Sequence, residues 1–427
     1  MAAKAGDPDS ARRLLAESIE LHEQDGDTHA AARVMSRLGV VDAFTGHRDE
    51  ALARMERAFA VISADEPDED IALLAARLAI MDWFSGNLER AAERAELALD
   101  IAEAHMYPEA LVIALRAKGA VAESRGHAQV AEALQKQSLV IALAHDLAED
   151  AATSYFILSD QCFRRDAYVD ALGYLDEALT LARKRGHRPY EWAVLAERMY
   201  ALSMLGRWDE ALSVSDEFTQ EQIDAGGVVL SLLQSGLEIH IQRGQLDEAR
   251  RIFSMFSRLD GSTDVQDRAM YLGSRAALHR TEGRLREALT DGEATIETAR
   301  TLGVGFQGVK WGIVEALEAA FTLGEAAKVE EILAAIETVP PGSRPPYLDA
   351  QARRIRARLA GDAAGYEAAA ERFRELGLPF WLAVTLLEHG EEPGLAEARE
   401  IFERLGATPW LERVAAAAAA PQAHVPA

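Results

Sequence analysis

Cysteine is almost absent from the sequence: Cys162 is the only one in 427 residues. An intrachain disulfide is therefore impossible, as in most proteins of a reducing compartment. Cys162 follows the apolar run 155–158, and this setting favours a buried structural thiol over a nucleophile. No apolar run is long enough to span a membrane and no secretory signal opens the chain, so we expect a cytoplasmic protein.

Motifs of enzyme and cofactor chemistry are also missing. The sequence has no Gly-Lys dipeptide, which excludes a phosphate-binding P-loop, and no Gly-x-Ser-x-Gly nucleophile motif. Its 11 histidines form no His-Glu-x-x-His motif, and a single cysteine argues against a structural zinc site. We therefore predict no enzyme activity, no cofactor and no metal. The alternative is an enzyme with an unrecognised site, which requires titratable groups with perturbed pKa values in one cleft.

One glycine pattern lies in the wrong context for a nucleotide site. Residues 303–308 match Gly-x-Gly-x-x-Gly, but they follow a predicted helix over 296–302 instead of a strand. A dinucleotide fingerprint requires a strand before the glycines and a helix after them. We therefore predict a flexible loop between two repeats.

Positive charge is scarce, with 45 Lys and Arg against 70 Asp and Glu, a net charge of −25. This excess opposes phosphate groups, so we expect neither nucleic acid nor an anionic membrane surface as a partner. The densest acidic stretch, 65–70, is interrupted by Pro67 and lacks the spacing of a calcium loop, which favours a solvated loop. Abundant Ala, and Arg in preference to Lys, suggest a GC-rich bacterial genome.

The sequence does contain a repeated Gly-x-x-x-x-Ala segment. It begins at positions 6, 46, 86, 126, 166, 206, 244, 283 and, in a weaker form, 324, and Asp166 replaces the glycine once. The first six starts are 40 residues apart, and the next intervals are 38, 39 and 41. A fixed period of this size is typical of a solenoid, in which stacked units share one continuous core.

Residues 71–104 illustrate the repeating unit. Leu74, Leu78 and Met81 recur at helical spacing, Gly86 follows, and a second helical series begins at Ala91. Glycine ends the first helix because it adopts the left-handed conformation without a Cβ clash. The fold class predicted is all-α, a right-handed superhelical solenoid of helix-turn-helix repeats of about 40 residues.

Small residues stand twelve positions before most of the turn alanines, where they permit close helix packing. Met199 and Leu237 break this rule, so the packing in their repeats must differ. The residues that follow the rule are Gly39, Ala79, Gly119 and Ser159.

The periodicity also predicts the organisation of the chain. Residues 1–338 form the repeat array, which starts in mid-repeat because a second helix begins at Ser10 without its partner. We interpret this start as the C-terminal part of a longer protein. Residues 339–347 form a proline-rich break, 348–414 form C-terminal helical repeats or a cap, and 415–427 form a disordered tail.

The repeat resembles the tetratricopeptide repeat (TPR) family over residues 6–338, with a small residue in the first helix, Gly at the turn and Ala in the second helix. Gly39, Gly46 and Ala51 carry this likeness in one copy. The period is longer than the common 34 residues. In this respect the repeats are similar to those in the C-terminal arms of large bacterial signalling ATPases.

A second resemblance covers residues 361–413. Segments 373–382 and 402–413 each contain a helix, a glycine stop and a Pro-aromatic restart, at Pro379-Phe380 and Pro409-Trp410. They resemble the C-terminal end of bacterial proteins that join a class III adenylate or guanylate cyclase domain, a STAND-type AAA ATPase domain and a TPR arm. The resemblance implies a sensor or regulatory arm that acts on upstream ATPase or cyclase domains, neither of which is present in this sequence.

Without a catalytic motif, the predicted site is a surface. In TPR-like stacks the first helices line a concave groove, where aromatic and Arg residues are frequent interface anchors. We predict a scaffold that binds a protein or peptide; the alternative is a small-molecule effector site inside the solenoid that regulates a signalling or transcription partner. For the individual residues the alternatives are a core position for the aromatics and ordinary solvation for the arginines. The candidate partner-binding residues are Trp83, Arg116, Glu123, Phe156, Asp160, Phe163, Arg164 and Tyr200, with Phe84 beside the first of them.

Overall fold

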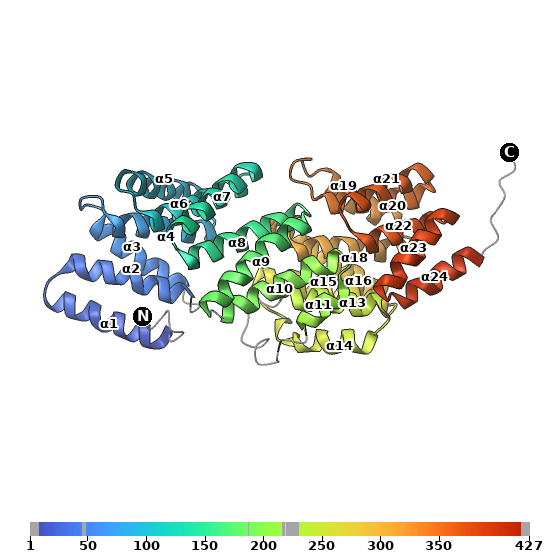
Figure 1. Ribbon diagram of the computed structural model, residues 1–427, viewed down its shortest axis with the longest axis horizontal. Helices are drawn as coiled ribbons and strands as arrows, with labels where there is room; N and C mark the ends of the chain where they lie inside the picture. Colours follow the sequence, from blue (N-terminus) through green and yellow to red (C-terminus); the bar gives the residue numbers. More distant parts are fainter. Residues whose placement is uncertain (1–7, 45–47, 187, 216–217, 219–229, 420–427) are drawn as a thin grey trace. The chain divides into compact units, whose positions relative to one another are not determined.

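The computed structural model describes residues 8–44, 48–186, 188–215, 218 and 230–419. These residues form helices joined by short turns, and they contain no strand (Figure 1). The chain divides into two compact units, Met1–Leu158 and Ser159–Ala427, here called unit 1 and unit 2. The prediction of an all-α fold built from helix-turn-helix repeats is confirmed.

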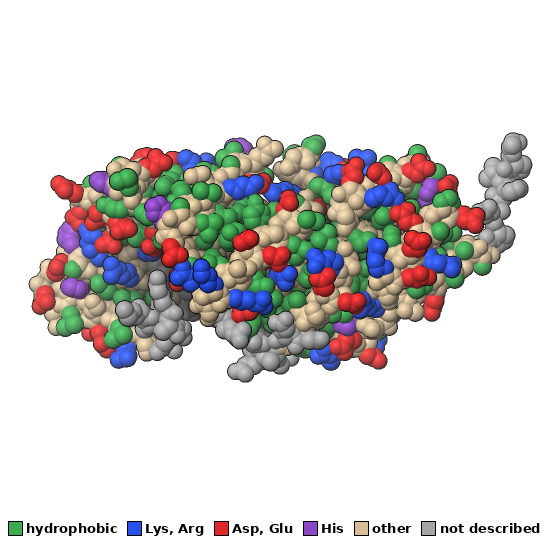
Figure 2. All heavy atoms as spheres, viewed as in Figure 1, with side chains coloured by type: hydrophobic (Ala, Val, Ile, Leu, Met, Phe, Trp, Pro, Cys, Tyr) green, Lys and Arg blue, Asp and Glu red, His purple; other side chains and the backbone are tan. Residues whose placement is uncertain are grey.

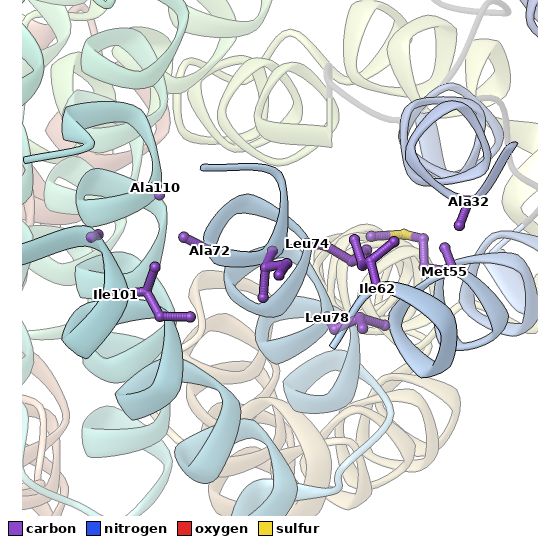
Figure 3. Packing of buried hydrophobic residues seen from close by; sticks show 11 residues of the cluster. Ala32, Met55, Ile62, Ala72, Leu74, Leu78, Ile101 and Ala110 are labelled. Atoms are coloured by element: carbon purple, nitrogen blue, oxygen red, sulfur yellow. The ribbon is translucent and has the colours of Figure 1, made fainter. Parts of the chain in front are cut away.

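Unit 1 is a series of helix pairs around a continuous apolar core. Met55, Ile62, Leu74, Leu78 and Ile101 come from three successive helices, α3, α4 and α5, and meet in one cluster (Figure 3). Its helices are α1 (Pro8–Gln24), α2 (Thr28–Phe44), α3 (Arg48–Ile62), α4 (Glu69–Phe84), α5 (Leu88–His105), α6 (Pro108–Ser124), α7 (Ala128–Ala144) and most of α8 (Ala148–Arg164).

The repeated turn has the predicted left-handed conformation. Gly86 and Gly126 have φ of 77° and 80°, and Gly206, Gly244, Gly283 and Gly324 are similar. Gly6 and Gly46 lie outside the described residues. A second left-handed turn lies midway between these, at Gly26, Met106, Asp146 and Gly186. The sequence pattern missed this turn because Met and Asp take the place of Gly in two copies.

The small residues of the first helices also pack as predicted. A Cβ added at Gly39 would lie 3.4 Å from the carbonyl oxygen of Ala51, and one at Gly119 would lie 3.4 Å from that of Ala131. Where Leu237 breaks the rule, the neighbouring Gly236 provides the close contact, since a Cβ added at Gly236 would lie 3.2 Å from Ile252 Cδ1. The packing therefore shifts by one residue in that repeat.

Two buried aspartates of unit 1 recur at the period of the repeat. Asp42 lies 2.9 Å from Arg12 Nε and 3.1 Å from Arg54 Nε. Asp82, forty residues later, lies 2.5 Å from Arg94 and also pairs with Arg90. Each carboxylate is fully buried and has two guanidinium partners, which compensates the cost of its burial.

Unit 2 contains more repeats, and its last ones return to pack on its first ones. The proline-rich segment lies between α19 and α20, and α24 extends through 415–419, so the first residues of the predicted tail are helical. The helices after α8 are α9 (Tyr168–Arg185), α10 (Arg188–Met204), α11 (Trp208–Ser215), α13 (Leu230–Gln242), α14 (Leu246–Met255), η2 (Ser257–Leu259), α15 (Val265–Thr281), α16 (Leu285–Glu297), α17 (Ala299–Leu302), α18 (Gln307–Leu323), α19 (Ala326–Glu337), α20 (Pro346–Ala360), α21 (Ala363–Glu375), α22 (Pro379–His389), α23 (Glu392–Leu405) and α24 (Thr408–Ala419).

Three C-terminal helices of unit 2 have proline at their first or second residue and dock on three successive repeat turns. At the start of α20, the Tyr347 amide donates to Asp166 Oδ2 at 2.7 Å. At the start of α22, Pro379 Cγ lies 2.5 Å from the position of a Cβ added at Gly206. At the start of α24, Pro409 Cγ lies 2.9 Å from the corresponding position at Gly244. We call Asp166, Gly206 and Gly244 the docking turns.

Aromatic residues that follow these prolines extend the contacts. Phe380 lies 5.6 Å from Trp208, between ring centroids. Trp410 Nε1 donates to Gln242 Oε1 at 2.7 Å. Arg243, beside the third docking turn, donates to the carbonyl oxygen of Leu405 at 3.0 Å. The predicted Pro-aromatic restarts are therefore contact points between distant repeats as well as helix starts.

Candidate functional site

Trp83, which is partly exposed, and Phe84, which is exposed, form an aromatic pair at the end of α4 in unit 1. Trp83 Nε1 donates to Ser124 Oγ on α6 at 2.8 Å, which fixes the indole. The Phe84 ring lies 4.6 Å from the Trp83 ring, between centroids, and 58% of Phe84 is exposed. A fixed aromatic pair that keeps this much surface in water is a candidate anchor for a partner.

Arg116 is part of a structural series of ion pairs instead of a free surface cation. It lies 2.8 Å from Asp150, and only 11% of its side chain is exposed. Burial lowers the pKa of Arg116 and the Asp150 carboxylate opposes this effect. Arg33 pairs in the same way with Asp68 at 2.6 Å, and Arg77 with Glu109 at 3.2 Å.

We call Arg33, Arg77 and Arg116 the arginine ladder. Each arginine is on the first helix of a repeat, and its acidic partner is at the start of the first helix of the following repeat. The helix dipole also favours negative charge at that position. The ladder therefore ties α2, α4, α6 and α8 together in order. Glu123 on α6 and Phe156 on α8 are partly exposed members of the same row of first helices.

Asp160 and Arg164 of unit 2 bind one another at 2.8 Å. Arg164 Nη1 also donates to the carbonyl oxygen of Leu302 at 3.0 Å. A Cβ added at Gly305 would lie 3.2 Å from both Arg164 Cβ and its carbonyl oxygen. The glycine-rich segment 303–308 is thus a packed contact against Arg164, in place of the predicted flexible loop. Glycine is needed there because the two backbones approach closely.

Phe163 and Tyr200 belong to the core of unit 2, with 4% and 2% of their surfaces exposed. They surround Lys310, whose Nζ donates to the Phe163 carbonyl oxygen at 2.7 Å and to Asp166 Oδ1 at 2.6 Å. Nζ also lies 3.4 Å from Tyr168 OH, which donates to Asp166 Oδ1 at 2.9 Å. We call these five residues the Lys310 centre.

Asp166 holds this centre because it occupies the turn position of its repeat, with φ of 62°. Aspartate tolerates this conformation better than most residues, and here it adds a buried carboxylate. Burial favours the neutral amine of Lys310, but the charge of Asp166 outweighs it and raises the pKa of Lys310. An ammonium group has three donors, and each finds an oxygen here. The centre is therefore a cross-link and not a catalytic base.

Two glutamates inside unit 2 have raised pKa values. Burial raises the pKa of Glu197 to about 8, with a contribution from Asp160. Burial and the charge of Glu315 raise the pKa of Glu238 to about 7. Ser231 Oγ donates to Glu197 at 3.2 Å, and Gln242 Nε2 donates to Glu238 at 3.0 Å.

The buried polar face of α13 provides several hydrogen-bonding groups, among them Ser231 and Gln242. The side-chain oxygen atoms of Gln234 and Ser235 are buried and have no hydrogen-bond partner among the described residues. Such groups favour a bound water or a polar ligand, because an unsatisfied buried acceptor costs free energy. The part of the chain that the structure describes has no group of three or more His, Cys, Asp or Glu arranged to hold a metal ion.

Two surface grooves lie near the C-terminus of unit 2. One, of about 450 Å³, lies between α20 and α21 and includes Arg353, Arg356 and Asp362. The other, of about 320 Å³, lies between α21 and α22 and includes Tyr366 and His389. Neither groove contains any of the predicted site residues. Among the described helices, none has the length and apolar character of a membrane span.

A family described as tetratricopeptide repeat matches residues 1–64. Three solved structures illustrate the similarity over the longer chain. A human IFIT1 dimer with m7Gppp-AAAA is 14% identical, with 97% of this chain and 95% of that chain covered and a TM-score of 0.47. The apo form of RapI is 16% identical, with 64% and 98% covered and a TM-score of 0.47. NprR in complex with its cognate peptide NprX is 12% identical, with 86% and 97% covered and a TM-score of 0.46.

No curated protein matches the sequence. At identities and TM-scores of this size, none of these structures identifies a ligand for this chain.

Proposed function

We propose that the protein is a helical-repeat scaffold that binds a protein or peptide partner through the first helices of unit 1. The observation that carries the proposal is the exposure of Phe84 beside the fixed Trp83. Aromatic residues in fixed positions anchor partners at a low cost in conformational entropy. In unit 2, by contrast, Phe163 and Tyr200 are buried around Lys310 and cannot serve in this way.

The arginine ladder supports this assignment because it sets the spacing of the helices that carry the aromatic pair. A surface held in place before binding loses less freedom when a partner arrives. Both units carry excess acid, with 28 Asp and Glu against 15 Lys and Arg in residues 1–158 and 42 against 30 in residues 159–427. Figure 2 shows acidic side chains interleaved with basic ones on the face in view. A protein partner remains our prediction, and nucleic acid is disfavoured by this charge.

A photo-crosslinking residue at position 84, introduced in the native host, would trap the partner in place. The trapped partner should then bind the purified chain, and Phe84→Ala with Trp83→Ala should weaken that binding by about tenfold or more. Val169→Ala, at an exposed valine of unit 2, is the matched control and should leave the affinity unchanged. Equal affinities of the aromatic variant and the unaltered chain would overturn the assignment.

We further propose that the scaffold is the regulatory arm of a cyclase and ATPase signalling protein. Residues 361–413, which resemble the end of such proteins, form the C-terminal helices that carry Pro379 and Pro409 onto the docking turns. Sequencing the genomic DNA upstream of the Met1 codon tests this proposal. An open frame that encodes a P-loop ATPase supports regulation in cis. A stop codon and a promoter immediately upstream would contradict it and favour a free-standing adaptor.

A second candidate function is regulation by a small polar effector inside unit 2. The buried oxygen of Gln234 and the carboxyl group of Glu238 favour it, because both offer hydrogen bonds inside unit 2 and a pKa of about 7 leaves Glu238 only partly charged at neutral pH. A screen of metabolites by thermal unfolding tests this function. A ligand that raises the melting temperature, and loses its effect in Gln234→Leu, would support it. A ligand whose effect persists in that variant binds elsewhere.

A further inference from the structure

Helix α7 of unit 1 presents an apolar face to water. Val130, Val140 and Leu143 are 52%, 58% and 51% exposed. The opposite face of the helix, with Ala131 and Leu139, is buried against its neighbours. Single exposed apolar residues are common on protein surfaces, but Val140 and Leu143 lie one turn apart and form an apolar patch that a partner can cover. Exposed Lys136, which pairs with Glu132, and Gln137 separate this patch from Val130.

Helix α5 presents a contrasting acidic face. Glu93, Asp100 and Glu103 are exposed at helical spacing, and none has an ion-pair partner among the described residues. Two other acids on this helix are neutralised by α6, since Glu89 lies 2.8 Å from Arg125 and Glu96 lies 2.7 Å from Lys118. The negative charge that stays uncompensated is thus confined to one stripe of α5.

Both faces flank the same helix, α6. Leu99 of α5 and Leu134 and Ile141 of α7 belong to one apolar cluster with Ile113 and Leu115 of α6. Helix α6 packs against both α5 and α7 (Figure 1). Asp100 and Glu103 of α5 occupy the same positions of their repeat as Val140 and Leu143 of α7, forty residues later, so the acidic stripe and the apolar patch face the same side of the repeat array in unit 1.

The negative charge of α5 determines which kind of partner this surface favours. A second copy of the chain would bring two acidic stripes together, and like charges disfavour that pairing. An anionic membrane would be repelled for the same reason. A segment with apolar residues on one face and Lys or Arg beside them matches both parts of the surface, because it covers α7 and pairs with α5.

We propose that the surface formed by α5 and α7 binds a basic amphipathic helix of a partner protein. The apolar side chains of that helix cover Val130, Val140 and Leu143, and its basic side chains face Glu93, Asp100 and Glu103. This surface is made of second helices and is separate from the aromatic pair on α4. It requires no contribution from the function proposed above.

The probe for this proposal is a fluorescein-labelled peptide of about five helical turns, with leucine on one face and lysine on the others. Fluorescence anisotropy with the full chain measures its binding. The peptide should bind, and raising the salt concentration should weaken binding because exposed charges contribute to it. The same peptide with glutamate in place of lysine should not bind.

Two variants of the chain test the two halves of the surface. Val140→Gln with Leu143→Gln removes apolar contact and keeps the charge, and Glu93→Gln, Asp100→Asn and Glu103→Gln together remove three charges. Each should weaken binding by about tenfold. The matched controls are Val169→Gln for apolar area and Glu392→Gln, Glu400→Gln and Glu403→Gln for net charge, and both should bind as the unaltered chain does.

The altered positions are exposed, so circular dichroism should give unchanged helix content and melting for every variant. The proposal is overturned if the lysine peptide does not bind, or if the Val140 and Leu143 variant binds it equally well. It is also overturned if the charge control loses as much affinity as the α5 variant, since the peptide would then respond only to net charge. Phe84→Ala should leave this binding unaffected, which separates it from the partner site on α4.

Discussion

Unit 1 and unit 2 are built from the same kind of repeat, but the contacts that stabilise each unit join residues at different separations along the chain. In unit 1 the arginine ladder joins neighbouring repeats, as in the pair of Arg116 with Asp150, 34 residues apart. In unit 2 the Lys310 centre joins residues 144 apart, and Tyr347 reaches Asp166 across 181 residues. The stability of unit 1 should therefore be close to a sum of neighbour terms, whereas unit 2 should unfold as one body.

The two units also differ in whether the aromatic residues of their first helices are exposed. Aromatic residues at related positions are exposed on α4 and buried in the Lys310 centre. A repeat array exposes its first helices only where no later repeat returns to cover them. In unit 2 the aromatic residues Phe163 and Tyr200 are buried within the unit, and in unit 1 Phe84 of α4 stays exposed.

The largest expected effect follows removal of the Lys310 charge. Lys310→Met should lower the free energy of unfolding of unit 2 by about 3–5 kcal/mol, because Asp166 stays buried without its cation. Urea unfolding followed by tryptophan fluorescence measures this loss. Adding Asp166→Gly to Lys310→Met should recover part of it, because glycine suits the left-handed turn and leaves no charge. A single variant as stable as the unaltered chain would contradict this role for the centre.

The next effect compares two turn glycines with the same backbone. Gly206 has φ of 72° and a Cβ there would meet Pro379, whereas Gly86 has φ of 77° and open space around it. Gly86→Ala should cost about 1 kcal/mol from backbone strain alone. Gly206→Ala should cost about 2–3 kcal/mol, since the clash with Pro379 adds to the strain. Equal losses in urea unfolding would show that docking at Gly206 contributes nothing.

A smaller effect depends on pH and is confined to unit 2. The folded pKa of Glu197 is about 8 and its ordinary value is 4.5, so the folded state retains a proton that the unfolded state releases. Stability should therefore fall as pH rises from about 4.5 to about 8. Glu197→Gln should remove this fall and stabilise the protein by on the order of 2 kcal/mol at pH 9, with little effect at pH 4.5. Thermal unfolding at both pH values measures the difference, and a gain of the same size at both would exclude titration of Glu197.

The smallest effect is expected in the arginine ladder. Arg116→Met keeps the aliphatic packing and removes one largely buried ion pair, but Asp150 keeps 17% of its side chain in water at the start of α8, where the helix dipole favours its charge, so the change should cost about 1 kcal/mol. Urea unfolding of the variant beside Lys310→Met gives the comparison between a neighbour contact and a distant one. A loss as large as that of Lys310→Met would mean that unit 1 also depends on single buried charges.

The sequence predicts contacts between neighbouring segments much better than contacts between distant ones. The turn at Gly86 follows from local conformational preference, and the packing at Gly39 and Gly119 follows from residue size. The restarts at Pro379 and Pro409 are predicted as helix starts. Their partners at Gly206 and Gly244 are not, because no local pattern specifies a contact with a repeat so far along the chain.

The candidate site was predictable in the same uneven way. Trp83 and Phe84 remain candidate partner-binding residues and Phe84 is exposed, whereas Phe163 and Tyr200 carry the same aromatic signal and lie in the core. Two departures from pattern could have indicated the Lys310 centre. Asp166 replaces a turn glycine, and Lys310 interrupts an apolar helix between Val309 and Trp311. A buried cation requires an anion, and an aspartate at an exceptional position is a plausible partner for it.

The separation in sequence between Asp166 and its partners also determines when this part of the chain can fold during synthesis. Lys310 and Tyr347 leave the ribosome 144 and 181 residues after Asp166. At about 5–20 residues per second this interval lasts roughly 10–30 s. Until then the Asp166 carboxylate lacks both partners, and the docking turns lack the C-terminal helices that pack on them. Each ion pair of the arginine ladder, in contrast, joins two neighbouring repeats, so both of its residues have already been synthesised. Unit 1 can therefore fold while the chain is being synthesised, whereas unit 2 can complete its fold only after α24 has been synthesised.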